Sequence, residues 1–149
     1  MHIASLVILS TLAGFSAFMA TAQEPRASAP DLSGTWKITV QDPGCSFGGQ
    51  AAVRPSETGY TANLVMRHDC PFFPEGPITA VQESTISISG AQVSVRSTII
   101  EFPSTDWSNS YAPDHFALTA TSDIRLFGIQ SDIYGTRPAE WVREESGIS

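Results

Sequence analysis

Residues 31–40 read "DLSGTWKITV", and this stretch decides the fold. Its apolar residues Trp36, Ile38 and Val40 alternate with polar ones, the period-two pattern of a strand with one buried face. Gly34 has no Cβ, so a neighbouring segment can approach the chain closely where the strand begins. The stretch therefore predicts a first β-strand that buries a large aromatic side chain near its start.

The same alternation recurs along the chain, with Gly, Pro, Asp and Ser between the runs. The runs lie at 60–66, 86–88, 93–95, 116–120, 123–134 and 139–145. Gly90, in "SGAQ", suits a tight hairpin turn. No helical periodicity longer than a turn is present. The pattern predicts an all-β antiparallel sandwich or barrel of about seven to eight strands.

The amino-terminal region has the features of a secretory signal peptide. An apolar run at 6–18 precedes Ala20-Thr21-Ala22, a small-x-small cleavage site. The run is short for a retained membrane anchor, which is the alternative. We predict a signal peptide at 1–22, a flexible proline-containing arm at 23–30 and a single β-barrel domain at 31–149. The protein is then periplasmic or secreted.

The net charge of the chain excludes some classes of binding partner. The net charge is −7, from 8 Lys and Arg against 15 Asp and Glu. Such a chain repels phosphate backbones and anionic membranes, so we expect neither nucleic acid binding nor stable membrane association.

Cys45 and Cys70 are the two cysteines. In an exported protein they are expected to form a disulfide, the alternative being a metal-binding or nucleophilic thiol.

The Gly34-x-Trp36 motif on the first strand resembles the calycin superfamily, which includes the lipocalins. The resemblance implies an up-and-down barrel. It also implies that Trp36 closes the barrel floor and that an arginine of the last strand lies across its ring. Arg143 is the residue here that could do so, and a guanidinium over an indole is worth ~0.5–2 kcal/mol.

The first half of the domain also resembles bacterial inhibitors of serralysin-type metalloproteases. The matching elements are "LSGTW" at 32–36, Cys45, "GYTA" at 59–62 and Cys70-Pro71. In those periplasmic barrels an extended amino-terminal segment enters the protease cleft. The resemblance implies that role for the arm, and its first residues are Gln23, Glu24 and Pro25. The carboxy-terminal "YGTRPAEWVREE" at 134–145 resembles generic lipocalin-like secreted proteins.

Two long loops carry candidate binding residues. Phe72 and Phe73 lie in "CPFFPEGP" at 70–77, and Trp107 and Tyr111 lie in "FPSTDWSNSYAPD" at 102–114. Loops of this length are uncommon without a function. These aromatics could form a binding rim at the open end of a barrel, or they could fold down as lids over the core. Trp141 follows the strand alternation and is expected to pack inside.

Catalytic and metal sites are less well supported. His68-Asp69 and Asp114-His115 are pairs of ligating residues, but a zinc site needs three or four converging ligands. No Gly-x-Ser-x-Gly elbow or phosphate-binding glycine loop is present. We predict no catalytic residue, no metal site and no cofactor.

Three functions remain. The first is a non-catalytic exported binding protein, most concretely a protease-inhibitor-like module whose partner is a secreted or periplasmic protease. The second is a carrier of a small apolar ligand in a lipocalin-like barrel. This reading requires an open cavity that Tyr60, Leu64, Met66 and Phe116 do not fill. The third is an enzyme of unknown type.

Overall fold

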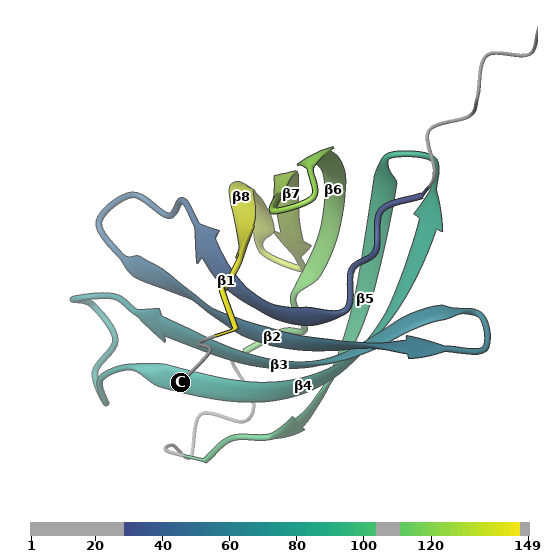
Figure 1. Ribbon diagram of the computed structural model, residues 1–149. Helices are drawn as coiled ribbons and strands as arrows, with labels where there is room; N and C mark the ends of the chain where they lie inside the picture. The colour runs from purple at the N-terminus through teal and green to yellow at the C-terminus, as the bar shows by residue number, and fades with distance from the viewer. Residues whose placement is uncertain (1–28, 104–110, 147–149) are drawn as a thin grey trace, which may run out of the picture.

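The computed structural model describes residues 29–103 and 111–146, and these form a closed antiparallel β-barrel (Figure 1). The strands are β1 (Gly34–Val40), β2 (Ser46–Ser56), β3 (Gly59–Asp69), β4 (Ile78–Ser89), β5 (Gln92–Glu101), β6 (His115–Ser122), β7 (Arg125–Asp132) and β8 (Gly135–Arg143). The predicted all-β fold is confirmed. None of the described residues forms an apolar helix long enough to cross a bilayer. The predicted signal peptide and all of the arm except Ala29 and Pro30 lie outside the described residues.

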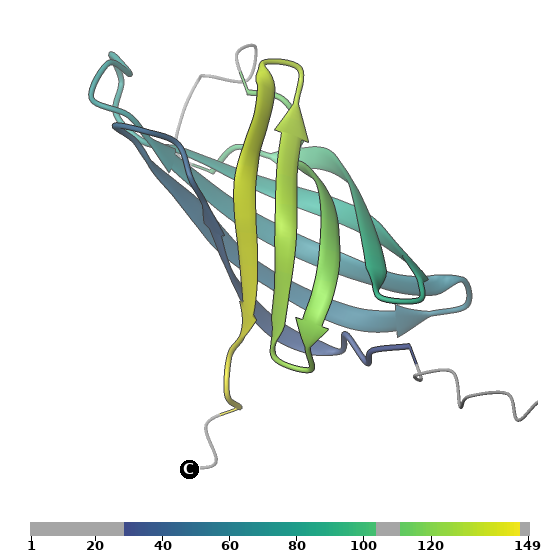
Figure 2. The same ribbon diagram turned by 90° about the horizontal axis from the view of Figure 1, so that it is seen from above.

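The strands follow one another around the barrel, and β1 pairs with β8 to close it. Because every strand is antiparallel to its neighbours, successive connections lie at opposite ends of the barrel (Figure 2). The connections β1–β2, β3–β4, β5–β6 and β7–β8 share one end, which we call the mouth. The turns β2–β3, β4–β5 and β6–β7 lie at the other end, the base, where the chain enters β1.

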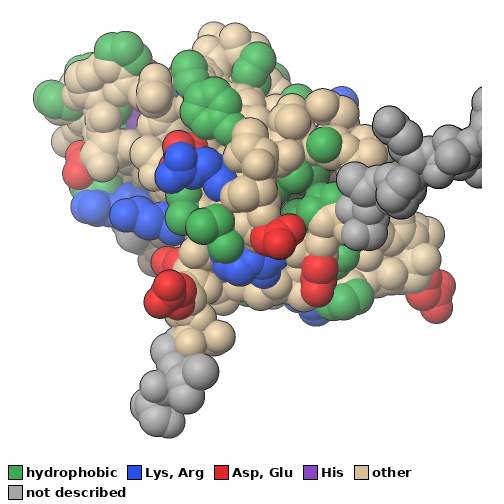
Figure 3. Space-filling view, turned by 45° about the horizontal axis from the view of Figure 1, so that its top comes forward, with side chains coloured by type: hydrophobic (Ala, Val, Ile, Leu, Met, Phe, Trp, Pro, Cys, Tyr) green, Lys and Arg blue, Asp and Glu red, His purple; other side chains and the backbone are tan. Residues whose placement is uncertain are grey.

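Side chains alternate between the barrel interior and the surface, as the period-two pattern predicts. In β3, Ala62, Leu64 and Met66 are buried, whereas Asn63 and Val65 between them are exposed. Inward apolar residues from all eight strands form one hydrophobic cluster. On the face shown in Figure 3, acidic and basic side chains are interspersed.

The base is closed by Trp36 and Arg143. Trp36 is 1% exposed, and its Nε1 donates to the carbonyl of Leu32 at 2.9 Å. The Arg143 guanidinium lies 4.4 Å from the centroid of the indole, the contact that the sequence analysis expected. Arg143 also donates to three backbone carbonyls, those of Asp31, Ser33 and Asp123. At Gly34, where φ is +122°, a Cβ would lie 3.0 Å from Arg143 Nη1, so the glycine makes room for the guanidinium.

Strand β2 was not among the runs that the sequence pattern picked out. Its sequence contains two adjacent glycines, Gly48 and Gly49, and a proline, which weaken a strand pattern. The glycines have a packing reason. A Cβ at Gly49 would lie 2.0 Å from the carbonyl oxygen of Val65, and one at Gly48 would lie 2.4 Å from that of Ile38. The neighbouring backbones therefore approach β2 too closely for any side chain at these positions.

Cys45 and Cys70 form the predicted disulfide. It joins the β1–β2 connection to the end of β3 and closes a loop of 25 residues at the mouth. The disulfide therefore holds together two of the four connections that surround the open end of the barrel.

Candidate functional site

The mouth of the barrel holds a pocket of about 390 Å³. Its apolar lining consists mainly of side chains from three different connections and the first residue of β4. These residues are Phe72, Phe73, Ile78, Tyr111, Ala112 and Tyr134. Phe72, Phe73 and Tyr111 were predicted either to form a rim at the open end of a barrel or to fold over the core as lids. All three side chains line this one pocket at the mouth.

The aromatic side of the pocket is built in layers. The ring of Phe73 contacts the imidazole of His68 edge-on, with 5.1 Å between ring centroids. The ring of Phe72 contacts that of Phe73 edge-on, with 5.3 Å between centroids. Behind them, His68 stacks on the buried ring of Phe47 at 4.1 Å between centroids. Phe72 is 74% exposed, whereas Phe73 is half-buried. The innermost ring is thus fixed by packing, and the outermost is presented to solvent.

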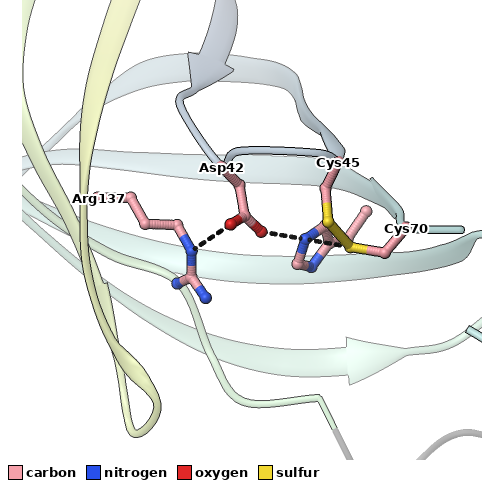
Figure 4. Close-up of a disulfide and its surroundings, with 5 residues drawn as sticks. Asp42, Cys45, Cys70 and Arg137 are labelled. Carbon is pink, nitrogen blue, oxygen red and sulfur yellow. Dashed lines mark hydrogen bonds and ion pairs between the residues drawn. A yellow bond between two sulfur atoms is a disulfide. The ribbon is translucent and has the colours of Figure 1, made fainter. Parts of the chain in front are cut away.

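The polar side of the pocket is a chain of hydrogen bonds and ion pairs centred on Asp42 (Figure 4). Its Oδ2 is hydrogen-bonded to His68 Nε2 at 2.7 Å, and its Oδ1 lies 3.5 Å from Arg137 Nε. Arg137 Nη1 donates to Asp132 Oδ2 at 3.1 Å and to Gln130 Oε1 at 3.2 Å. These side chains come from the β1–β2 connection, β3, β7 and β8, so only barrel closure brings them together.

A second layer of polar groups lies deeper, centred on the fully buried Asp114. Its carboxylate accepts hydrogen bonds from Gln82 Nε2 and Gln130 Nε2, both at 2.7 Å, and from the Tyr111 hydroxyl at 2.6 Å. Burial raises the pKa of Asp114, although these three hydrogen bonds oppose the shift. Burial and the nearby Asp114 charge also raise the pKa of Tyr111. Gln130 bonds to Asp132 as well, which links this layer to the lining of the pocket.

Below this layer the barrel is filled by side chains. Leu64 and Met66 are 0% exposed, Phe116 is 2% exposed, and Tyr60 packs against the same cluster. None of these four residues lines the mouth pocket. The ligand-carrier prediction required a cavity inside the barrel that these four side chains leave open, whereas they are packed in the core. The mouth pocket lies above this packed core, and its lining is partly charged.

The predicted histidine pairs do not assemble into one site. His68 bonds to Asp42, whereas His115 Nδ1 accepts the backbone N–H of Ser97. Among the described residues, one group of potential metal ligands lies within 4.8 Å: Asp42, Cys45, His68 and Cys70. The two sulfurs are bonded to each other, which leaves two ligands, fewer than the three or four of a zinc site.

The remaining predicted residues are placed as follows. Gln23, Glu24, Pro25 and Trp107 lie outside the described residues. Trp141 is 1% exposed inside the barrel, as expected, and meets Phe116 edge-on at 5.2 Å.

Sequence reasoning missed six residues of the lining: Asp42, Ile78, Ala112, Asp132, Tyr134 and Arg137. The order of the strands could have identified these residues as candidates for one site. In an up-and-down barrel every second connection lies at the same end, so residues of alternate connections are candidates for one site.

Comparison with known proteins supports the fold. The chain matches no protein-family model and no curated protein. Among solved structures it resembles the redesigned β-barrel mFAP1 bound to DFHBI. That protein is 20% identical with a TM-score of 0.51, over 76% of this chain and 94% of that one. The redesigned barrel mFAP0 bound to DFHBI is 21% identical with a TM-score of 0.50, over 76% of this chain and 98% of that one. At these identities the likeness shows the fold alone, that of a small β-barrel. Because both are designed proteins, they assign the chain to no natural family.

Proposed function

We propose that this chain is a non-catalytic, exported binding protein that holds a small organic molecule in its mouth pocket. The observation that carries the proposal is the pocket itself. Its volume of about 390 Å³ falls within the ~300–1,000 Å³ typical of small-molecule sites. Such sites combine apolar and aromatic walls with a few fixed polar groups, and this pocket has both.

A disulfide and ion pairs cross-link the segments around the pocket, which favours binding without large rearrangement. The disulfide fixes two of its connections, and the ion pairs of Asp42 and Arg137 tie β8 to the β1–β2 connection. Preorganised walls lower the entropic cost of binding. The neighbours mFAP1 and mFAP0 are described as bound to DFHBI, which is compatible with a barrel of this size acting as a small-molecule binder.

A fragment screen on residues 23–149 tests this function. Ligand-observed NMR would detect weak binders, and each would then be titrated against the wild type and two variants. Phe73→Ala removes the fixed aromatic wall, whereas Phe127→Ala removes a ring that is 47% exposed on the outside of β7. We expect binders whose affinity falls at least fivefold with Phe73→Ala and is unchanged with Phe127→Ala. No binders, or binders equally affected by both variants, would refute the pocket as the site.

Protease inhibition is a second candidate, favoured by the disulfide, which forms between the two cysteines of the inhibitor-like register. In this reading the arm that begins at Gln23 enters the protease cleft. Pro30 lies beside the β4–β5 and β6–β7 turns, so the arm joins the barrel at its base. The two candidate functions would therefore use opposite ends of the molecule. Incubation with a serralysin-type protease tests inhibition, and full protease activity at micromolar concentrations of the barrel rejects it.

A further inference from the structure

The mouth carries more negative than positive charge. The described residues of its four connections include Asp42 and Glu75, and Asp132 ends strand β7. Against these acids, the pocket lining contains one guanidinium, that of Arg137. This excess adds to the net charge of −7 that the whole chain carries.

The charge of Arg137 is already matched within the protein. Its Nε faces Asp42 at 3.5 Å and its Nη1 faces Asp132 at 3.1 Å, and its side chain is only 19% exposed. A bound anion would compete with both carboxylates for the same guanidinium. Arg137 is therefore a structural counter-ion between two acids.

The lining holds two carboxylates against one guanidinium, those of Asp42 and Asp132 against that of Arg137. Asp42 and Asp132 both lie against the single guanidinium of Arg137. Asp114 is left out of this count, since burial favours its protonated form. A cationic group entering the pocket would gain from this excess, whereas a carboxylate would be repelled.

The apolar wall adds a second preference for cations. The rings of Phe72, Phe73 and Tyr111 line the pocket beside the carboxylates. The faces of aromatic rings attract cations, and flat rings also stack on them. A molecule that combines a planar ring with an ammonium group would use both sides of the pocket at once.

We propose that the ligand of the mouth pocket is an aromatic amine in its cationic form. This inference rests on the proposed function and names its ligand class. The aromatic ring lies against Phe72 and Phe73, and the ammonium group faces the side of the pocket formed by Asp42 and Asp132.

Three indoles that differ in charge test the ligand class: tryptamine, 3-methylindole and indole-3-acetate. Calorimetric titration of residues 23–149 at low salt leaves charge effects unscreened. We expect tryptamine to bind at least tenfold more tightly than indole-3-acetate, with 3-methylindole between them. Equal affinities, tighter binding of the carboxylate, or no binding by any of the three would overturn the proposal.

Two charge variants test whether the preference for tryptamine arises at the mouth of the barrel. Asp42→Asn removes one of the two carboxylates that line the pocket, and the preference for tryptamine is expected to fall at least threefold. Asp123→Asn makes the same change in net charge at the β6–β7 turn of the base and is the matched control. An equal loss in both variants would overturn the mouth as the source of the preference. Fragments that bind through Phe73 without favouring amines would reject this inference and leave the proposed function intact.

Discussion

Replacing Arg143 by methionine is expected to destabilise the barrel by about 2–4 kcal/mol. Arg143 lies 4.4 Å above the Trp36 ring and donates to the carbonyls of Asp31, Ser33 and Asp123. The ring contact is worth ~0.5–2 kcal/mol. A hydrogen bond to a charged group contributes ~1.5–3 kcal/mol when buried, but Arg143 is half-buried, so its three bonds are discounted to about 2 kcal/mol together.

This loss would be large for a domain of this size, because typical domain stabilities are ~5–15 kcal/mol. Urea unfolding followed by tryptophan fluorescence and by far-ultraviolet circular dichroism would measure it. Arg96→Met, at an exposed position on β5, is the matched control and should change the free energy of unfolding by less than ~0.5 kcal/mol. Arg143→Lys keeps the charge but loses the fork of donors, so it should recover only part of the loss.

Two results would refute the reasoning. If Arg143→Met costs less than ~1 kcal/mol, the base does not depend on the guanidinium, and Trp36 alone closes it. If Arg143→Lys is as stable as the wild type, charge alone suffices, and the three hydrogen bonds contribute nothing specific.

Two further predictions concern β2 and the buried acid. Gly49→Ala should lower the free energy of unfolding, measured in urea, by about 1–3 kcal/mol, because its Cβ would lie 2.0 Å from the carbonyl oxygen of Val65. The control Ala52→Ser, at an exposed position on the same strand, should leave the free energy of unfolding unchanged. Equal stabilities of the two variants would contradict the close approach of the backbones. Asp114 has a raised pKa, so the folded state holds its proton more tightly than the unfolded state, and stability falls as pH rises from about 4 through the folded pKa. Asp114→Asn removes this contribution. Urea unfolding at several pH values should therefore show the wild type losing stability relative to Asp114→Asn across that window, and parallel profiles would contradict it.

The fold was predictable from the sequence because strand alternation is a local property. Trp36, Ile38 and Val40 show by their spacing alone which face of β1 is buried, and the structure agrees. The barrel closure and the contact between Trp36 and Arg143 came from the resemblance that the motif carries. The disulfide followed from two cysteines in a chain expected to be exported.

Strand β2 could not be predicted from its local sequence pattern. Gly48 and Gly49 weaken the strand pattern, yet they are required because the backbones of β1 and β3 approach β2 closely. That requirement belongs to the pairing of strands, so no property of residues 46–56 by themselves reveals it.

The candidate site was decided only by the tertiary structure. Asp42, His68, Asp132 and Arg137 are spread over 96 positions of the chain and meet because barrel closure brings β8 against β1. Each of these four is a polar residue at or near the end of a strand, and its neighbours in the sequence do not distinguish it from other such residues. The sequence by itself determined which residues alternate and therefore which face inward. The position of the pocket, its volume and its charge depend on distances between strands, which no local pattern encodes.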